Sequence, residues 1–208
     1  SEAARAFALL TGGPPKTGGL GWWWHTPEDT VDKIDPDFLV RDAKIYTQII
    51  THLCTTPVLP YDYAAVADEF ARILGDIQTK AGSHFDLNPV QEKVRRLKEL
   101  CVTLNRVKER IGKEGTVEQC RRLNKTLMAL GRHLIPVNYT SVGPFDHDLA
   151  TRVEPIPALQ PATQLASLDP ESNEYRFLRT RLVRERNKVA HALSLACTEI
   201  ENTLTALG

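Results

Sequence analysis

Apolar residues recur every three or four positions along almost all of the chain after residue 34, and prolines and glycines divide the pattern into segments. This spacing places the apolar side chains in a stripe along one side of an α-helix. Asp35-Pro36, Asn88-Pro89 and Asp169-Pro170 each put a capping side chain before a proline, and proline suits the first helical turn because its missing N–H is unpaired there anyway. The pattern therefore predicts a chain built of amphipathic helices.

We expect these helices at residues 36–53, between Asp62 and Gly82, at 89–111, between Thr116 and Pro136, and at 170–207. Thr116 and Gln119 have the spacing of a capping box, and Pro136 is expected to end the helix that the box opens. Residues 137–168 contain several prolines and should be irregular, either functional or wrapped over the helices. No alternating apolar run predicts a substantial sheet. The predicted fold is all-α, an antiparallel four- to five-helix bundle with a long C-terminal helix, preceded by an irregular Gly/Trp-rich segment.

The composition and net charge of the chain argue against nucleic acid and membranes as partners. The 208 residues are 42% hydrophobic and 25% charged, values typical of folded globular chains. No apolar run approaches the roughly 20 residues that span a bilayer. The 26 basic and 26 acidic side chains cancel, so no overall field would attract nucleic acid or an anionic membrane. We therefore expect neither as a partner.

The four cysteines, Cys54, Cys101, Cys120 and Cys197, are far apart and form no CxxC pair. This spacing argues against a zinc knuckle and against a thioredoxin-like motif. We interpret them as small buried apolar residues.

Residues 18–35, with the sequence GGLGWWWHTPEDTVDKID, are the most unusual part of the chain. On one interpretation the three indoles pack on the bundle, His25 is hydrogen-bonded, and the acids cap the following helix. On the other, His25 is a metal ligand beside an aromatic wall formed by Trp22, Trp23 and Trp24.

The string His25-Thr26-Pro27-Glu28-Asp29-Thr30, followed by Asp32-Lys33-Ile34-Asp35, resembles the last metal-ligand segment of the co-catalytic zinc aminopeptidases and glutamate carboxypeptidases. That family also includes the catalytically inactive transferrin receptor. The resemblance implies that His25 is the final ligand of a two-zinc site in a full-length parent protein. From their position beside His25, we expect Trp22, Trp23 and Trp24 to lie near the substrate cleft of that parent protein.

The other parts of that two-zinc site are missing from this sequence. The family has an earlier His-x-Asp, a bridging Asp, an adjacent Glu-Glu pair and a further acid, and this chain has no Glu-Glu pair and no histidine before His25. A catalytic zinc requires about three protein ligands and an open position. We therefore expect no cofactor and no peptide hydrolysis for this chain alone.

Two further stretches, LNKTLMALGR at 123–132 and GPFDH at 143–147, resemble the dimerisation domain that follows the catalytic domain in the same family. The resemblance implies that residues 1–34 are the edge of a peptidase-like catalytic domain and 35–208 a transferrin-receptor-like helical domain. It further implies a homodimer formed through that helical domain. Residues 145–157 are shorter than the family pattern and lack its tyrosines. The expected function is thus a dimerisation and accessory domain that is not catalytic by itself.

A stand-alone metal-dependent hydrolase is the alternative from the enzyme class. Its metal would be gathered by His25 with acids such as Asp29, Asp32, Asp146 and Asp148. His147 stands between two of these carboxylates, but neighbouring residues rarely all face one ion. We favour a hydrogen-bonded histidine that fixes the loop.

A helical adaptor or nucleic-acid binder is the alternative from the binding class. Residues 176–188 carry five arginines and a lysine with one acid, but few aromatic residues accompany them. Solvated helix charges, or ion-pair partners for Glu171 and Glu174, are the preferred interpretation, and an ion-pair seam between subunits is a further one. Asn124-Lys125-Thr126 and Asn138-Tyr139-Thr140 fit the glycosylation pattern, which is common by chance.

Overall fold

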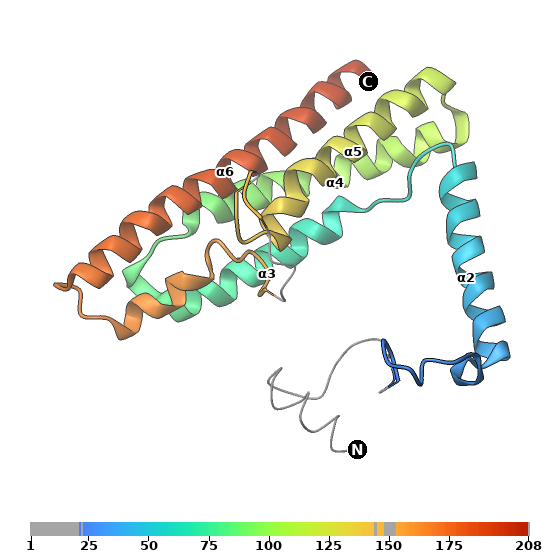
Figure 1. Cartoon of the computed structure of the whole chain (residues 1–208). Coiled ribbons are helices and arrows are strands. Elements are labelled where there is room, and N and C mark those ends of the chain that lie inside the picture. Colours follow the sequence, from blue (N-terminus) through green and yellow to red (C-terminus); the bar gives the residue numbers. More distant parts are fainter. Residues whose placement is uncertain (1–20, 22, 144, 148–152, 208) are drawn as a thin grey trace. The chain divides into compact units, whose positions relative to one another are not determined.

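A computed structural model describes residues 21, 23–143, 145–147 and 153–207, and its fold is all-α (Figure 1). No strand occurs within those ranges. The chain divides into two compact units, Ser1–Thr55 and Thr56–Gly208. The domain boundary between residues 34 and 35 that the sequence indicates stays a prediction.

The described part of the first unit contains a short 3-10 helix, η1 (Val31–Lys33), and the helix α2 (Pro36–Thr55). Asp35 caps α2 as predicted, because its carboxylate accepts hydrogen bonds from the N–H groups of Asp37 at 2.9 Å and Phe38 at 3.2 Å. No residue of α2 is buried. Its exposed large apolar side chains are Phe38, Leu39, Val40, Ile45, Tyr46, Ile49, Ile50 and Leu53.

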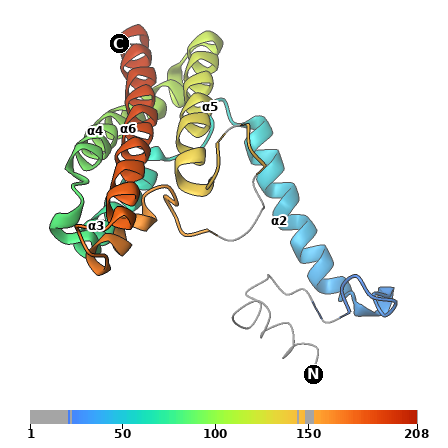
Figure 2. The ribbon, with the colours of Figure 1, turned by 60° about the vertical axis from the view of Figure 1, so that its left-hand side comes forward.

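The second unit is a bundle of four long helices: α3 (Tyr63–Ala81), α4 (Asn88–Glu114), α5 (Val117–Tyr139) and α6 (Asn173–Leu207). Successive helices run in opposite directions, and α6 lies along α4 and α5, as Figures 1 and 2 show. At 35 residues α6 is about 52 Å long and spans the bundle. The fully buried core includes Phe70, Leu74, Leu97, Leu104, Leu123, Leu127 and Leu130. The predicted helical bundle with a long last helix is confirmed.

Local capping signals account for the starts of α3 and α5. Asp62 caps α3 by accepting from Ala64 N–H at 3.0 Å. Thr116 and Gln119 form the predicted capping box, with Gln119 N–H donating to Thr116 Oγ1 at 3.2 Å and Thr116 N–H donating to Gln119 Oε1 at 2.8 Å.

The predicted helix ends at the other prolines are wrong by a few residues. α5 continues past Pro136 to Tyr139, because a proline in the last turn removes only its own N–H while its carbonyl still accepts from Thr140 N–H at 3.2 Å. Asn88 was predicted to cap α4 from outside, but it is the first residue of the helix. Its N–H donates to the side chain of Asp86. α6 begins at Asn173, after Ser172 Oγ accepts from Tyr175 N–H at 3.1 Å.

The proline-containing excursion after α5 covers the bundle where it is described. Ile156, Leu159, Ala162 and Leu165 are fully buried, and the 3-10 helix η3 (Gln160–Ser167) packs against α3 and α6. Ile156 adopts a φ of +52°, in the left-handed region that isoleucine rarely occupies, and its N–H donates to Asn138 O at 3.2 Å. The interpretation that this stretch wraps over the helices is confirmed for residues 156–167, although η3 itself was not predicted.

No helix in the described ranges is long and apolar enough to cross a membrane.

Candidate functional site

The segment around His25 is an exposed series of turns that leads into η1 and α2. The imidazole of His25 stacks on the indole of Trp24, with ring centroids 3.8 Å apart and an angle of 19° between the planes. The backbone N–H of His25 donates to Asp29 Oδ2 at 3.3 Å, and His25 has a φ of +61°. Thr26 Oγ1 donates to Trp23 O at 2.6 Å. The turn therefore presents a stacked Trp–His pair whose imidazole makes no hydrogen bond to another described residue.

The predicted site residues are only partly brought together. Trp24 lies against His25, Trp23 is partly exposed, and Trp22 lies outside the described residues. The Asp29 carboxylate accepts a hydrogen bond from the backbone N–H of His25. Lys33 and Thr30 donate hydrogen bonds to Asp32 and lower the pKa of its carboxyl group. Both acids thus have local structural partners.

A zinc ion does not fit the described residues of this chain taken alone. Among them, no group of three or more His, Cys, Asp and Glu side chains could hold a metal ion. A catalytic zinc needs about three protein ligands, and the turn offers the single imidazole of His25. Any zinc bound through His25 would need ligands from elsewhere.

The metal site considered around Asp146, His147 and Asp148 gains no support from the described residues. Asp146 fixes a turn, since its Oδ2 accepts from Gly143 N–H at 3.1 Å and its own N–H donates to Gly143 O at 3.1 Å. His147 is exposed and has no hydrogen-bond partner among the described residues, so the loop-fixing role expected for it belongs to Asp146. Asp148 lies outside the described residues.

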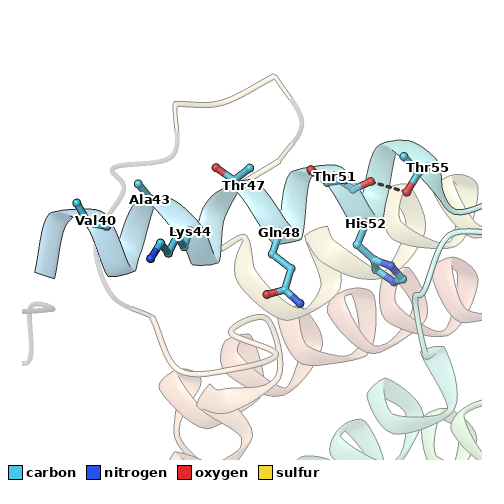
Figure 3. Close-up of a pocket in the computed structure, with 8 residues that line it drawn as sticks. All are labelled: Val40, Ala43, Lys44, Thr47, Gln48, Thr51, His52 and Thr55. Atoms are coloured by element: carbon cyan, nitrogen blue, oxygen red, sulfur yellow. Dashed lines mark hydrogen bonds between the residues drawn. The ribbon is translucent and has the colours of Figure 1, made fainter. Parts of the chain in front are cut away.

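Helix α2 has two distinct faces. Its more polar face borders an open hollow of about 710 Å³, lined by Val40, Ala43, Lys44, Thr47, Gln48, Thr51, His52 and Thr55 (Figure 3). Thr55 Oγ1 donates to Thr51 O at 2.7 Å, which ties one side chain back to the helix. The other face carries Phe38, Ile45, Ile49 and Leu53, all exposed. A helix with such an apolar face normally covers a core.

The segment that precedes α3 is held against the bundle by side chains that sequence reasoning missed. Asn124 Oδ1 accepts from Leu59 N–H at 2.8 Å, and Asn124 Nδ2 donates to Pro57 O at 3.0 Å. Tyr63 Oη donates to Leu127 O at 2.7 Å. Asn124 belongs to a glycosylation pattern and to the stretch 123–132, and no local signal in the sequence identifies partners that lie more than sixty residues away.

The second glycosylation pattern is also explained by structure. Asn138 is buried, with 4% of its surface exposed, and its backbone carbonyl receives the hydrogen bond from Ile156. Glycan attachment requires an exposed asparagine side chain. Asn138 is therefore a structural residue at the end of α5.

The basic segment of α6 separates into paired and unpaired charges. Arg176 forms an ion pair with Glu171, as the sequence suggested, and Lys188 pairs with Glu185 at 2.8 Å. Arg186 donates to Asp86 O at 2.7 Å and lies over the Phe85 ring, 5.3 Å from its centroid. The exposed side chains of Arg179, Arg181 and Arg184 have no acidic partner within the described part of the chain.

The interpretation of the cysteines holds for three of them. Cys101, Cys120 and Cys197 are buried free thiols, and burial raises the pKa of both Cys101 and Cys197, that of Cys101 to about 12. Cys54 is exposed on α2, so the prediction that it is buried is wrong. It lies on the helix that has no buried residue.

Comparison of the chain with models of known protein families, with curated proteins and with solved structures found no match.

Proposed function

We propose that this chain is a dimerisation and accessory domain of a zinc-dependent, peptidase-like protein and does not catalyse peptide hydrolysis by itself. Residues 35–208 would be the helical domain that pairs two copies. Residues 1–34 would belong to the edge of the catalytic domain. The proposal rests on the resemblance of the His25 segment and of residues 123–147 to the zinc peptidase family.

The structural observation that supports the proposal is the exposed apolar face of α2. This helix buries none of its residues, whereas the four helices that follow it, together with residues 156–165, enclose a core of their own. An apolar helix face of this width is stable in water only when another body covers it. We propose the catalytic domain of the same protein as that body.

In this arrangement His25 would supply one metal ligand to the zinc site of the full-length protein. It lies before η1 and α2 in the sequence, on a turn fixed by Asp29 and by the Trp23–Thr26 hydrogen bond. The remaining ligands would come from the catalytic domain, because the described residues supply only this imidazole at the turn. The indole of Trp24 would line the same cleft. When bound, the zinc ions would polarise the scissile carbonyl and activate a water molecule.

Light scattering on the 208-residue chain, combined with metal analysis of the same sample, tests the proposal. The expected result is a dimer that contains far less than one zinc per chain. A monomer that retains stoichiometric zinc after dialysis would contradict the proposal and support a stand-alone metallohydrolase.

The unpaired arginines of α6 make nucleic-acid binding the second outcome to measure. Arg179, Arg181 and Arg184 are exposed on one helix, and phosphate contacts depend steeply on salt. A fluorescent random-sequence duplex and a single strand, titrated at two salt concentrations, provide the readout. The proposal expects no binding near physiological salt. Salt-dependent binding of a monomeric chain would instead favour the adaptor.

A further inference from the structure

An open apolar groove of about 800 Å³ lies between the first turn of α3 and the second half of α5. Tyr63 and Val66 of α3 form part of it, and Met128 and Ile135 project from α5 on the other side. Gly131 lets Tyr63 approach, because a Cβ atom there would lie 3.1 Å from the Tyr63 hydroxyl. The groove belongs wholly to the second unit.

Several exposed apolar side chains surround the groove. Met128 is 45% exposed and Ile135 59% exposed, and Tyr61 at the groove's end is 42% exposed. Tyr139, one turn beyond Ile135 on the same face of α5, is 63% exposed. Large apolar side chains gathered in this way mark an interaction surface more often than scattered ones do.

Two opposite charges border this apolar surface. Asp62 lies at the α3 end of the groove, and Asn105 and Ala64 donate hydrogen bonds to its carboxylate at 2.9 and 3.0 Å. Arg132 lies on the α5 side and has no acidic partner among the described residues. Rotation by 180° about an axis between these two groups would place the arginine of each copy against the aspartate of the other. The surface is therefore complementary in charge to itself.

We propose that this groove is the two-fold interface of the dimer, formed by the α3–α5 surfaces of two copies of this chain. Met128, Ile135 and Tyr61 would form its apolar centre, and Arg132 would pair with Asp62 of the second copy on both sides. The inference rests on the proposed function, since it names the surface through which the proposed dimer forms.

Ile135→Asp tests the apolar centre, with Val117→Asp as the matched control. Both side chains are exposed on α5, Val117 by 68%, but Val117 lies at the start of the helix and outside the groove. The expected result is a dissociation constant raised about tenfold or more by Ile135→Asp and unchanged by Val117→Asp, measured by sedimentation equilibrium. Far-UV circular dichroism of each variant checks that the helices remain.

Asp62→Asn and Arg132→Gln test the charge pairing, and asparagine preserves the cap of α3. Each single variant breaks both pairs in its own dimer. A mixture of the two variants allows a mixed dimer in which one Arg132–Asp62 pair is intact. We expect each variant alone to dimerise more weakly than the wild type and the equimolar mixture to dimerise more strongly than either.

The outcomes separate this inference from the proposed function. A wild-type dimer that Ile135→Asp does not weaken would overturn the α3–α5 interface and leave the dimerisation function standing. A mixture no stronger than the single variants would overturn the charge pairing. A wild-type chain that stays monomeric at all concentrations would overturn both proposals.

Discussion

The side-chain amide of Asn124 on α5 holds the backbone of Leu59, with Oδ1 accepting from the Leu59 N–H at 2.8 Å. The same amide donates through Nδ2 to Pro57 O at 3.0 Å. One asparagine thus satisfies a donor and an acceptor of the segment that enters the bundle. A second amide, Gln78, acts in the same way at the far end of α3, where it bonds the carbonyls of Gly82 and Phe85 and the N–H of Leu87.

Asn124→Asp should destabilise the bundle although the change is nearly isosteric. A carboxylate cannot donate to Pro57 O and would place a negative charge against that carbonyl, so we expect a loss of about 1–3 kcal/mol in the free energy of unfolding. Urea unfolding followed by circular dichroism measures it. Asn187→Asp, at an exposed position of α6, is the control and should change little. Equal effects at the two positions would mean that the contact with Leu59 and Pro57 is unimportant.

The buried hydroxyl pair Thr126–Thr203, 2.6 Å apart between α5 and α6, should show strong coupling. Thr126→Val leaves the Thr203 hydroxyl without this partner and should lower stability by about 1–3 kcal/mol. Thr203→Val should cost less, because Thr126 Oγ1 still donates to Arg122 O at 3.2 Å. The double variant replaces both polar groups and should cost less than the sum of the two single changes. A double-mutant cycle from thermal and urea unfolding tests this, and strict additivity would contradict the coupling.

Thiol labelling should distinguish Cys54 from Cys101. Cys54 is exposed and should react with a thiol reagent in the native chain at neutral pH, whereas Cys101 is buried and burial raises its thiol pKa to about 12. Mass spectrometry of the labelled peptides provides the measurement, and denatured protein provides full labelling of both. Rapid native labelling of Cys101 would contradict the packed α4–α6 contact.

Because burial raises the pKa of the Cys101 thiol, we expect the free energy of unfolding to fall at alkaline pH. The unfolded thiol ionises from about pH 8.5, while the folded thiol stays neutral until about 12, so the unfolded state is favoured progressively as the pH rises through this window. The contribution is fully present below about pH 8.5. Cys101→Ala should have a flatter decline of unfolding free energy between about pH 8 and about pH 10.5 than the wild type. Parallel declines would show that Cys101 ionises alike in both states.

Substitutions on α2 and on the bundle core should behave very differently. Ile49→Asp adds a charge to an exposed face and should leave the melting temperature of the bundle unchanged while it improves solubility. Leu193→Asp places a charge in a fully buried position of α6 and should cost more than about 4 kcal/mol. A fragment of residues 56–208 should unfold at the same temperature as the whole chain. Loss of cooperative unfolding in that fragment would contradict the independence of the bundle.

The parts of the fold that could be predicted depend on local chemistry. The cap at Asp35, the box at Thr116 and the periodic stripes of α3, α4 and α6 use neighbouring residues, so the sequence reveals them directly. Pro136 was misjudged because a proline in the last turn interrupts little of the helix. The left-handed Ile156 is held by a hydrogen bond to Asn138 and by burial, and neither is visible in its neighbours.

The candidate site was predicted only in part for a similar reason. The motif around His25 is contiguous in sequence, and the structure shows the stacking of Trp24 on the imidazole. The groove between α3 and α5 combines Asp62 with Arg132, which are far apart along the chain. Periodicity identified the buried side of α5 and carried no information about the exposed side, where Met128 and Ile135 lie.

The packing of η3 against α3 also affects how the molecule is made. α3 packs against α4, its immediate successor, and also against η3, which comes after α5 and buries Ala162 and Leu165. During synthesis α3, α4 and α5 therefore emerge first, and the apolar side of α3 that η3 contacts stays exposed until η3 and α6 leave the ribosome. Such late, long-range contacts slow folding relative to a simple up-and-down bundle. Chains that terminate early would expose that side of α3 permanently and be substrates for chaperones and proteases.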